Sequence, residues 1–193
     1  MHNLEELIQW VKTNRPTLFL DRDGVINKRL PGRYVQQVEE FQFYPNLSEH
    51  WSTLNQYFQH VLVVTNQQGI GKELMTHEDL AVVHDYMLFE IEMSGGAIDE
   101  IYYCPELADH DPVCRKPNPG MALEAQADFP EINFKNALMV GDSISDIQFG
   151  QQLGMKTLLI NTKKGELQKL EEQGVIPNAT LDSLMDFIRH LKA

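Results

Sequence analysis

Four short polar clusters in this sequence contain the residue types needed for phosphoryl chemistry. They comprise Asp21 with Asp23, Thr65 with Asn66, Arg115 with Lys116, and Gly141 with Asp142. Carboxylates that lie together repel one another unless a cation sits among them, and hard oxygen ligands suit Mg²⁺. Such a cation and a lysine together form an anion site. The clusters therefore predict a magnesium site for a phosphate ester, with Asp21, Asp23 and Asp142 as metal-binding residues.

The spacing of the first cluster indicates two-step hydrolysis. A carboxylate that faces a phosphate bound beside Mg²⁺ can accept the phosphoryl group. A second carboxylate two residues away points the same way at a strand end, so it can protonate the leaving alcohol and later deprotonate water. We therefore predict Asp21 as the nucleophile and Asp23 as the general acid and base. We expect the phosphate to contact Thr65, Asn66 and Lys116.

Short apolar segments precede these clusters and have the character of buried strands. We predict strands at residues 17–20, 60–64, 97–103, 137–140 and 156–160. Between or after them, helices are predicted at about 45–58, from Thr76 to about 93, at 120–129, from 141–143 onward, and at 181–191. Alternating strands and helices favour an α/β fold with a doubly wound parallel sheet and helices on both faces. Ligands bind beyond the carboxyl ends of such strands, where the four clusters should converge.

We expect a single domain over residues 1–193, because the sequence has no linker, repeat or low-complexity tract. Residues 1–16 form an N-terminal helical extension, whose apolar stripe either packs on the domain's own surface or forms a dimer contact. Segments 28–44 and 104–119 are predicted to be loops that face the substrate. We expect a monomer or a weak homodimer.

The net charge limits the classes of partner. Lys and Arg number 16 and Asp and Glu number 28, so the formal charge is 16 − 28 = −12. Nucleic acids and anionic membranes require clustered basic residues, so neither is an expected partner. No apolar run approaches the length of a membrane span, and the N-terminus does not resemble a signal peptide, which favours a cytoplasmic protein. Two cysteines cannot form a disulfide framework, and we expect Cys104 and Cys114 to be reduced.

The order and spacing of the clusters resemble the four motifs of the haloacid-dehalogenase-like phosphatases. The matching segments are DRDGV at 21–25, Thr65-Asn66, Lys116 and GDSISD at 141–146. The resemblance implies that Asp21 is the nucleophile and a Mg²⁺ ligand, and that Asp23 adds its backbone carbonyl to the metal. It implies that Asp142 ligates Mg²⁺, and that Asp146 orients Lys116 or metal-bound water.

Longer segments are similar to one branch of that family. They are FLDRDGVIN at 19–27, VVTNQQGIG at 63–71, IYYCP at 101–105, CRKPNPGM at 114–121 and VGDSISD at 140–146. The branch contains D-glycero-D-manno-heptose-1,7-bisphosphate 7-phosphatases and histidinol-phosphatases, with a small insert instead of a large cap domain. The resemblance implies that Arg115 and the 28–44 loop contact the rest of the substrate. It favours the 7-phosphate of the heptose bisphosphate over histidinol phosphate.

The sequence departs from that branch at its usual structural zinc loop. Cys104 and Cys114 match two ligand positions, whereas Glu106 and Pro112 stand at the other two. A tetrahedral zinc site needs four ligands, so we expect this loop to fold without zinc.

Two interpretations from other functional classes remain open. A phosphoacceptor switch also uses an acidic Mg²⁺ pocket with a threonine and a lysine, and a catalytically silent interaction protein could retain this fold. The carboxylate of Asp23, two residues after the nucleophile, favours hydrolysis over a long-lived phosphoryl group.

Overall fold

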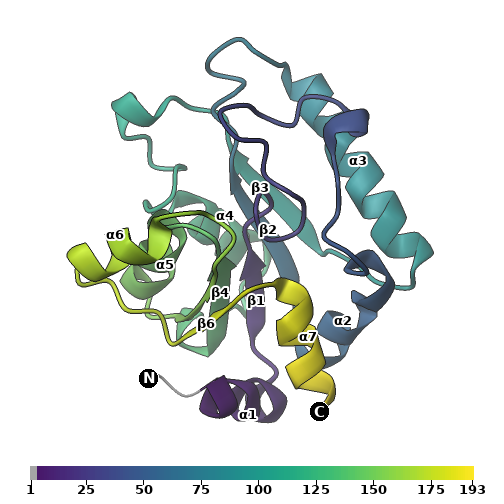
Figure 1. Ribbon diagram of the computed structural model, residues 1–193, viewed down its shortest axis with the longest axis vertical. Coiled ribbons are helices and arrows are strands. Elements are labelled where there is room, and N and C mark those ends of the chain that lie inside the picture. The colour runs from purple at the N-terminus through teal and green to yellow at the C-terminus, as the bar shows by residue number, and fades with distance from the viewer. Residues whose placement is uncertain (1–3) are drawn as a thin grey trace.

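The computed structural model describes residues 4–193, whose strands form one parallel sheet (Figure 1). The six strands lie in the order β3-β2-β1-β4-β5-β6. Their bounds are β1 Thr17–Leu20, β2 Val61–Asn66, β3 Glu100–Cys104, β4 Ala137–Gly141, β5 Lys156–Ile160 and β6 Ala179–Leu181. The strand order reverses at β1, which places β2 on one side of it and β4 on the other. This confirms the predicted doubly wound α/β fold.

Helices cover both faces of the sheet, as predicted (Figure 1). Their bounds are α1 Leu4–Asn14, α2 Ser52–Tyr57, α3 His77–Met93, α4 Gly120–Asp128, α5 Ile144–Gln152, α6 Glu166–Glu172 and α7 Leu184–Lys192. Side chains alternate along a strand, so Leu18 and Leu20 pack with α1, α2, α3 and α7. Phe19 points the other way and packs with α4 and α5. Within residues 4–193, no helix is both long and apolar enough to span a membrane.

The N-terminal helix α1 packs on the molecule itself. Leu7 and Val11 of α1 are buried in the same hydrophobic core as Phe187 and Leu191 of α7. This packing confirms the first of the two interpretations of the apolar stripe. Residues 1–3, the start of the predicted extension, lie outside the described part of the chain.

Two of the predicted helices begin later than expected, for local reasons. The helix predicted at 45–58 is a short 3₁₀ turn at Ser48–His50 followed by α2. It cannot begin at Pro45 because the next residue, Asn46, has a φ of 62°, in the left-handed region. The helix predicted at 181–191 begins at Leu184, where the Ser183 hydroxyl accepts a hydrogen bond from the Asp186 amide. Leu181 instead ends β6, a strand that the sequence did not predict.

Candidate active site

The predicted site residues converge at the carboxyl ends of the strands. Asp21 and Asp142 directly follow the adjacent strands β1 and β4, and Thr65 lies near the end of β2. The loop after β3 brings in Lys116. These segments surround a cavity of about 680 Å³. The predicted residues that line it are Asp21, Asp23, Thr65, Asn66, Arg115, Lys116 and Asp146. Asp142 lies behind this lining and is 1% exposed.

Lys116 links two carboxylates at the floor of the cavity. Its Nζ lies 2.9 Å from Asp21 Oδ1 and 2.6 Å from Asp146 Oδ1, and it donates to the Val64 carbonyl at 2.7 Å. Burial alone would lower the pKa of Lys116, but the two carboxylates outweigh it and raise the pKa. The lysine is therefore protonated and points between Asp21 and Asp146. Asp146 is placed to orient Lys116.

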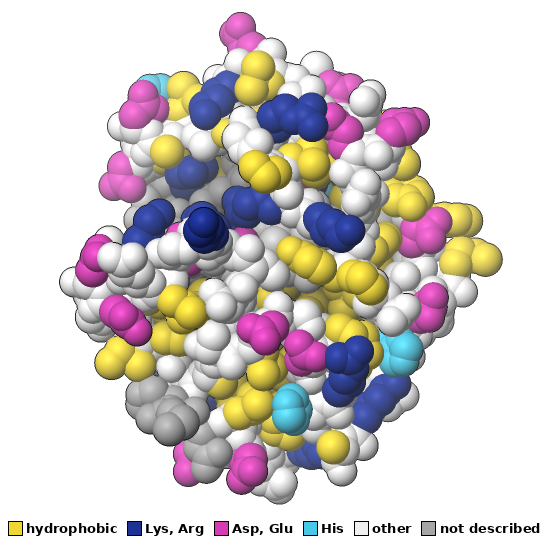
Figure 2. All heavy atoms as spheres, in the orientation of Figure 1, with side chains coloured by type: hydrophobic (Ala, Val, Ile, Leu, Met, Phe, Trp, Pro, Cys, Tyr) yellow, Lys and Arg dark blue, Asp and Glu magenta, His cyan; other side chains and the backbone are white. Residues whose placement is uncertain are grey.

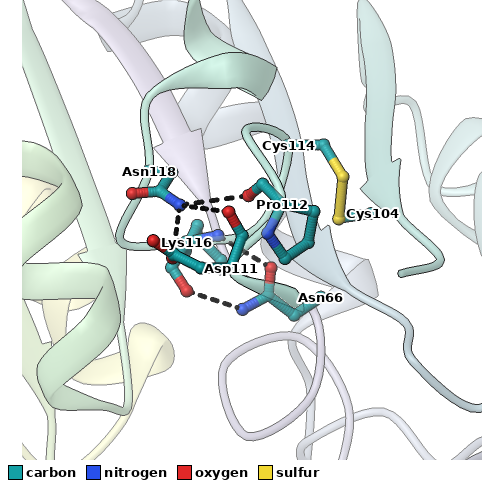
Figure 3. Close-up of a disulfide and its surroundings, with 7 residues drawn as sticks. All are labelled: Asn66, Cys104, Asp111, Pro112, Cys114, Lys116 and Asn118. Atoms are coloured by element: carbon teal, nitrogen blue, oxygen red, sulfur yellow. Dashed lines mark hydrogen bonds between the residues drawn. A yellow bond between two sulfur atoms is a disulfide. The ribbon is translucent and has the colours of Figure 1, made fainter. Parts of the chain in front are cut away.

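The loop that carries Lys116 is tied to β2 and β3 (Figure 3). Asn66 Oδ1 accepts from the Lys116 amide at 3.0 Å, and Asn66 Nδ2 donates to the Lys116 carbonyl at 3.1 Å. The Asn66 side chain is thus committed to the loop, so any phosphate contact of Asn66 falls to its backbone N–H.

Cys104 and Cys114 form a disulfide, so the prediction of two reduced thiols was wrong (Figure 3). Cys104 ends β3, and the loop turns back so that the two Cα atoms lie 5.3 Å apart, a separation that a disulfide can bridge. Asn118 holds this turn by donating to Asp111 Oδ1 at 2.8 Å. Each sulfur is bonded to the other, which leaves neither as a zinc ligand. The disulfide instead joins the end of β3 to the segment that carries Lys116.

Two glycines allow the carboxylates to approach the strand ends. Gly24 has a φ of 101°, and a Cβ there would overlap the carboxylate of Asp142. A Cβ on Gly141 would overlap the side chain of Asp146. Any larger residue at either position would displace a carboxylate from the cavity floor.

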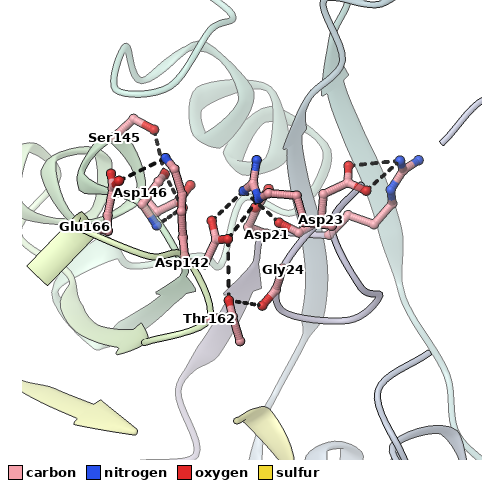
Figure 4. Close-up of polar contacts among 12 residues, drawn as sticks. Asp21, Asp23, Gly24, Asp142, Ser145, Asp146, Thr162 and Glu166 are labelled. Atoms are coloured by element: carbon pink, nitrogen blue, oxygen red, sulfur yellow. Dashed lines mark hydrogen bonds and ion pairs between the residues drawn. The ribbon is translucent and has the colours of Figure 1, made fainter. Parts of the chain in front are cut away.

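A guanidinium lies on the carboxylate of Asp142. Arg29, from the 28–44 loop, donates through Nε to Asp142 Oδ2 at 3.1 Å and through Nη2 to Oδ1 at 2.6 Å. The same Nη2 donates to the backbone carbonyl of Asp23 at 2.9 Å. Thr162 contacts Asp142 Oδ2 at 3.5 Å from the other side and donates to the Gly24 carbonyl (Figure 4). The carboxylate of Asp142 and the carbonyl of Asp23 thus bind a cationic group, the guanidinium of Arg29.

The carboxylate cluster has the composition expected of a magnesium site. Oxygen atoms of Asp21, Asp142 and Asp146 lie within 4.8 Å of one another. Burial, followed by the negative charge of Asp21, raises the pKa of Asp142 to about 7 despite the guanidinium of Arg29. Lys116 and Arg29 bring two positive charges to the three carboxylates of Asp21, Asp142 and Asp146. A divalent cation among these hard oxygen donors would supply the missing positive charge, so the residues fit Mg²⁺.

Asp23 is held by donors from three side chains. Arg22 Nη2 lies 3.1 and 2.9 Å from its two carboxylate oxygens, Asn27 Nδ2 donates to Oδ1 at 2.9 Å, and Gln67 Nε2 donates to Oδ2 at 2.8 Å. Burial would raise the pKa of Asp23, but Arg22 and the other donors outweigh it and lower the pKa. Asp23 is therefore ionised. Gln67 Nε2 also lies 2.9 Å from Thr65 Oγ1, which couples the positions of Asp23 and Thr65.

Behind Asp23, the buried Arg22 is supported by His84 of α3. Arg22 Nη1 lies 3.1 Å from His84 Nε2, and the arginine is fully buried. Burial and then the charge of Arg22 lower the pKa of His84 to about 3. His84 is therefore neutral at physiological pH, and its Nε2 accepts a hydrogen bond from Arg22. Protonation would remove this acceptor and place two cations in contact.

We expect His84→Gln to flatten the acid side of the stability profile. The folded-state pKa of His84 lies below its unfolded value of 6.5, so its contribution to stability is present above pH 6.5 and is lost as the pH falls toward 3. When the pH falls from about 7.5 to about 5, His84 lowers the free energy of unfolding by about 2 kcal/mol. Glutamine does not titrate, so the variant should lack this part of the pH dependence. Urea unfolding at the two pH values measures it. His190→Gln, an exposed histidine, is the control. If His84→Gln and the original protein had the same pH dependence of stability, His84 would not be the neutral, buried acceptor of Arg22 described above.

Basic side chains gather around the cavity of this acidic protein. Figure 2 shows Lys and Arg side chains around a hollow in the upper part of the face. Arg115 lines the cavity, and its Nη1 is buried without a hydrogen-bond partner. The other basic residues of the lining are Arg29, Arg33, Lys72, Lys116, Lys163 and Lys169. Lys116, Lys163 and Lys169 pair with carboxylates of the same lining, whereas Arg115 and Lys72 form no ion pair with a carboxylate of the described residues and can contact a second anionic group of a ligand.

Several contributors to the site were not predicted from the sequence. Gln67 follows Thr65-Asn66 directly, and its place in the strand-end turn was the one available signal. Arg29 lies in a loop that was predicted to face the substrate, but nothing in the sequence indicated that its side chain contacts Asp142. Glu166 accepts from the Ile144 amide at 2.8 Å and lies on α6, a helix that was not predicted.

Comparisons with known proteins bear on this site. A family model described as HAD-hydrolase-like matches residues 113–187. A D-glycero-alpha-D-manno-heptose-1,7-bisphosphate 7-phosphatase of Mycobacterium tuberculosis is 32% identical over 174 residues, covering 88% of each chain. A D-glycero-beta-D-manno-heptose-1,7-bisphosphate 7-phosphatase of Vibrio cholerae is 35% identical over 186 residues, covering 92% of this chain and 96% of the relative.

A solved structure resembles the fold over most of its length. It is the D,D-heptose 1,7-bisphosphate phosphatase of B. bronchiseptica, complexed with magnesium and phosphate. The TM-score is 0.81 at 29% sequence identity, covering 91% of this chain and 98% of the other.

Proposed function

Because this chain belongs to the haloacid-dehalogenase-like hydrolases, we propose that it removes the 7-phosphate of a D-glycero-D-manno-heptose 1,7-bisphosphate with the help of Mg²⁺. The observation that carries the phosphatase assignment is the convergence of Asp21, Lys116 and Asp146 on one cavity beside Asp23, with an oxygen of the buried Asp142 within 4.8 Å of oxygens of Asp21 and Asp146. The substrate assignment is supported by the names of relatives that match nearly the full chain. The basic lining supports it too, because it suits a substrate with two phosphates.

In the first step, a carboxylate oxygen of Asp21 attacks phosphorus and the bond to the sugar oxygen breaks. This produces an aspartyl-phosphate on Asp21 and a leaving oxygen that takes a proton from Asp23. Lys116 remains protonated and offsets negative charge beside the phosphoryl group. Bound Mg²⁺, held by Asp21, Asp142 and the Asp23 carbonyl, would neutralise phosphate oxygens.

In the second step, Asp23 takes a proton from water, and the water oxygen attacks phosphorus. The bond to Asp21 breaks, inorganic phosphate is released and the Asp21 carboxylate is restored. The ionised Asp23 of this structure has the form that this second step requires. The first step needs the protonated form, and the negative charge of an arriving phosphate would raise the pKa of Asp23 toward it.

A substrate panel tests the proposal. Inorganic phosphate is measured with both anomers of the heptose 1,7-bisphosphate, with histidinol phosphate and with simple sugar phosphates. We expect kcat/KM to be highest for one heptose anomer, with one phosphate released per sugar. EDTA should stop release, and excess Mg²⁺ should restore it.

Each contrary result has a distinct meaning. A preference for histidinol phosphate, or equal weak rates on all compounds, would refute the heptose assignment and keep the phosphatase. Stoichiometric phosphorylation of the protein without turnover would indicate a phosphoacceptor switch. No phosphate release from any compound with Mg²⁺ present would refute the enzymatic function.

A further inference from the structure

Arg29 contacts two of the three groups that the proposed function assigns to the metal, Asp142 and the Asp23 carbonyl. Its guanidinium donates to both carboxylate oxygens of Asp142 and to the backbone carbonyl of Asp23. These atoms come from two different strand ends. Arg29 itself comes from the 28–44 loop, 113 residues from Asp142 in the sequence. The loop therefore delivers a protein cation to the magnesium position.

Arg29 and a metal ion cannot both use these atoms in this arrangement. The guanidinium binds Asp142 through a two-pronged contact, which engages both of its oxygens. A divalent ion at the same oxygens would also lie against the positive charge of the guanidinium. Binding of one cation must therefore accompany release of the other.

The arginine can leave without disturbing the core. Its side chain is 41% exposed, whereas that of Asp142 is 1% exposed. It lines the cavity, so an outward rotation of the side chain leads into open space. Asp142 stays fixed by its strand end and by the tight approach of Gly24.

We propose that Arg29 holds the magnesium position of the metal-free protein and that Mg²⁺ binds by displacing it. This inference rests on the proposed function, because it uses the metal ligands named there. Only the molecules in which Arg29 has left Asp142 can bind Mg²⁺. The measured affinity therefore equals the intrinsic affinity multiplied by the fraction of molecules in that state. The Arg29 contact thus weakens the affinity for Mg²⁺, and it also stabilises Asp142 when no metal is bound. Through Arg29, the 28–44 loop determines the Mg²⁺ concentration that the site needs for occupancy.

The test compares Mg²⁺ binding by Arg29→Gln and by the original protein, using isothermal titration calorimetry without substrate. Arg29→Gln is expected to bind Mg²⁺ at least about fivefold more tightly, because no side chain has to be displaced. Arg29→Lys keeps the charge but loses the two-pronged contact, so its Kd should lie between the two. Lys28→Gln removes the same charge from the adjacent exposed residue and should leave the Kd unchanged.

Thermal unfolding supplies an independent readout with the opposite sign. In EDTA, Arg29→Gln should have a lower Tm than the original protein, and saturating Mg²⁺ should reduce or remove the difference. Circular dichroism before titration establishes that each variant is folded, and Arg29→Lys provides the comparison if Arg29→Gln is not. An unchanged or weaker Mg²⁺ affinity in Arg29→Gln would overturn the proposal. That result would leave the phosphatase assignment intact, since the substrate panel decides it separately.

Discussion

Asp21→Asn is expected to lower phosphate release by at least about 10⁴-fold, the scale seen when a catalytic nucleophile is removed. The amide is nearly the same size as the carboxylate, and its oxygen can still accept from Lys116 Nζ, which lies 2.9 Å from Asp21 Oδ1. The amide is a far weaker nucleophile and carries no charge for a metal. The change therefore removes the attacking group without emptying its position.

Steady-state phosphate release, together with a chemical trap, measures this effect. The original protein, quenched in acid during turnover, should carry a phosphoryl group that is released by hydroxylamine, and Asp21→Asn should carry none. Asp85→Asn, at an exposed aspartate of α3 outside the cavity lining, is the matched control and should retain activity. Mass spectrometry checks that the introduced amide has not reverted to aspartate by deamidation. Near-normal turnover by pure Asp21→Asn would exclude this residue as the nucleophile.

Asp23→Asn is expected to lower turnover of a sugar phosphate by about 10²- to 10⁴-fold, the usual contribution of a general acid and base. The loss should depend on the leaving group. A sugar alkoxide leaves poorly without a proton, whereas p-nitrophenolate needs little help. The first step should therefore be much less impaired with p-nitrophenyl phosphate than with the sugar phosphate.

Single-turnover rates with the two substrates separate this chemical role from a structural one. A structural defect would lower the rates with both substrates by the same factor, because loss of the folded site does not depend on the leaving group. The substitution also removes the charge that faces the buried Arg22, so the Tm of the variant must be measured alongside. Equal losses with both substrates would contradict the assignment of Asp23 as the general acid.

Much of the site's location could be predicted from local sequence. Apolar strands that stop abruptly at Asp21 and Asp142 place both side chains at the same edge of a parallel sheet, whatever the details of packing. The structure confirmed the sheet and brought the four clusters together at one cavity, with Asp142 buried behind the lining. Short elements with weak apolar patterns were missed. The strand Ala179–Leu181 has three residues, and the helix Glu166–Glu172 has seven.

The cysteines show where local reasoning failed. Two cysteines ten residues apart give no information about their distance in space, and a low cysteine count favoured reduced thiols. Pairing depends on how the 104–119 loop turns, which in turn depends on contacts such as that of Asn118 with Asp111. Such contacts exist only in the folded loop, and no pattern of residue types predicts them.

Residue types and their order along the chain were enough to predict the chemistry of this protein: which carboxylates lie at strand ends, which lysine accompanies them, and that a cation and a phosphate ester suit the set. This information is local because it depends on residue type and on the direction of one strand. The partners that surround each group could be identified only in the folded molecule. The contacts of Arg29 with Asp142, and of Gln67 with Asp23, join segments far apart in the chain. Their geometry arises from the packing of loops against strand ends, so it becomes visible only once the whole chain is folded.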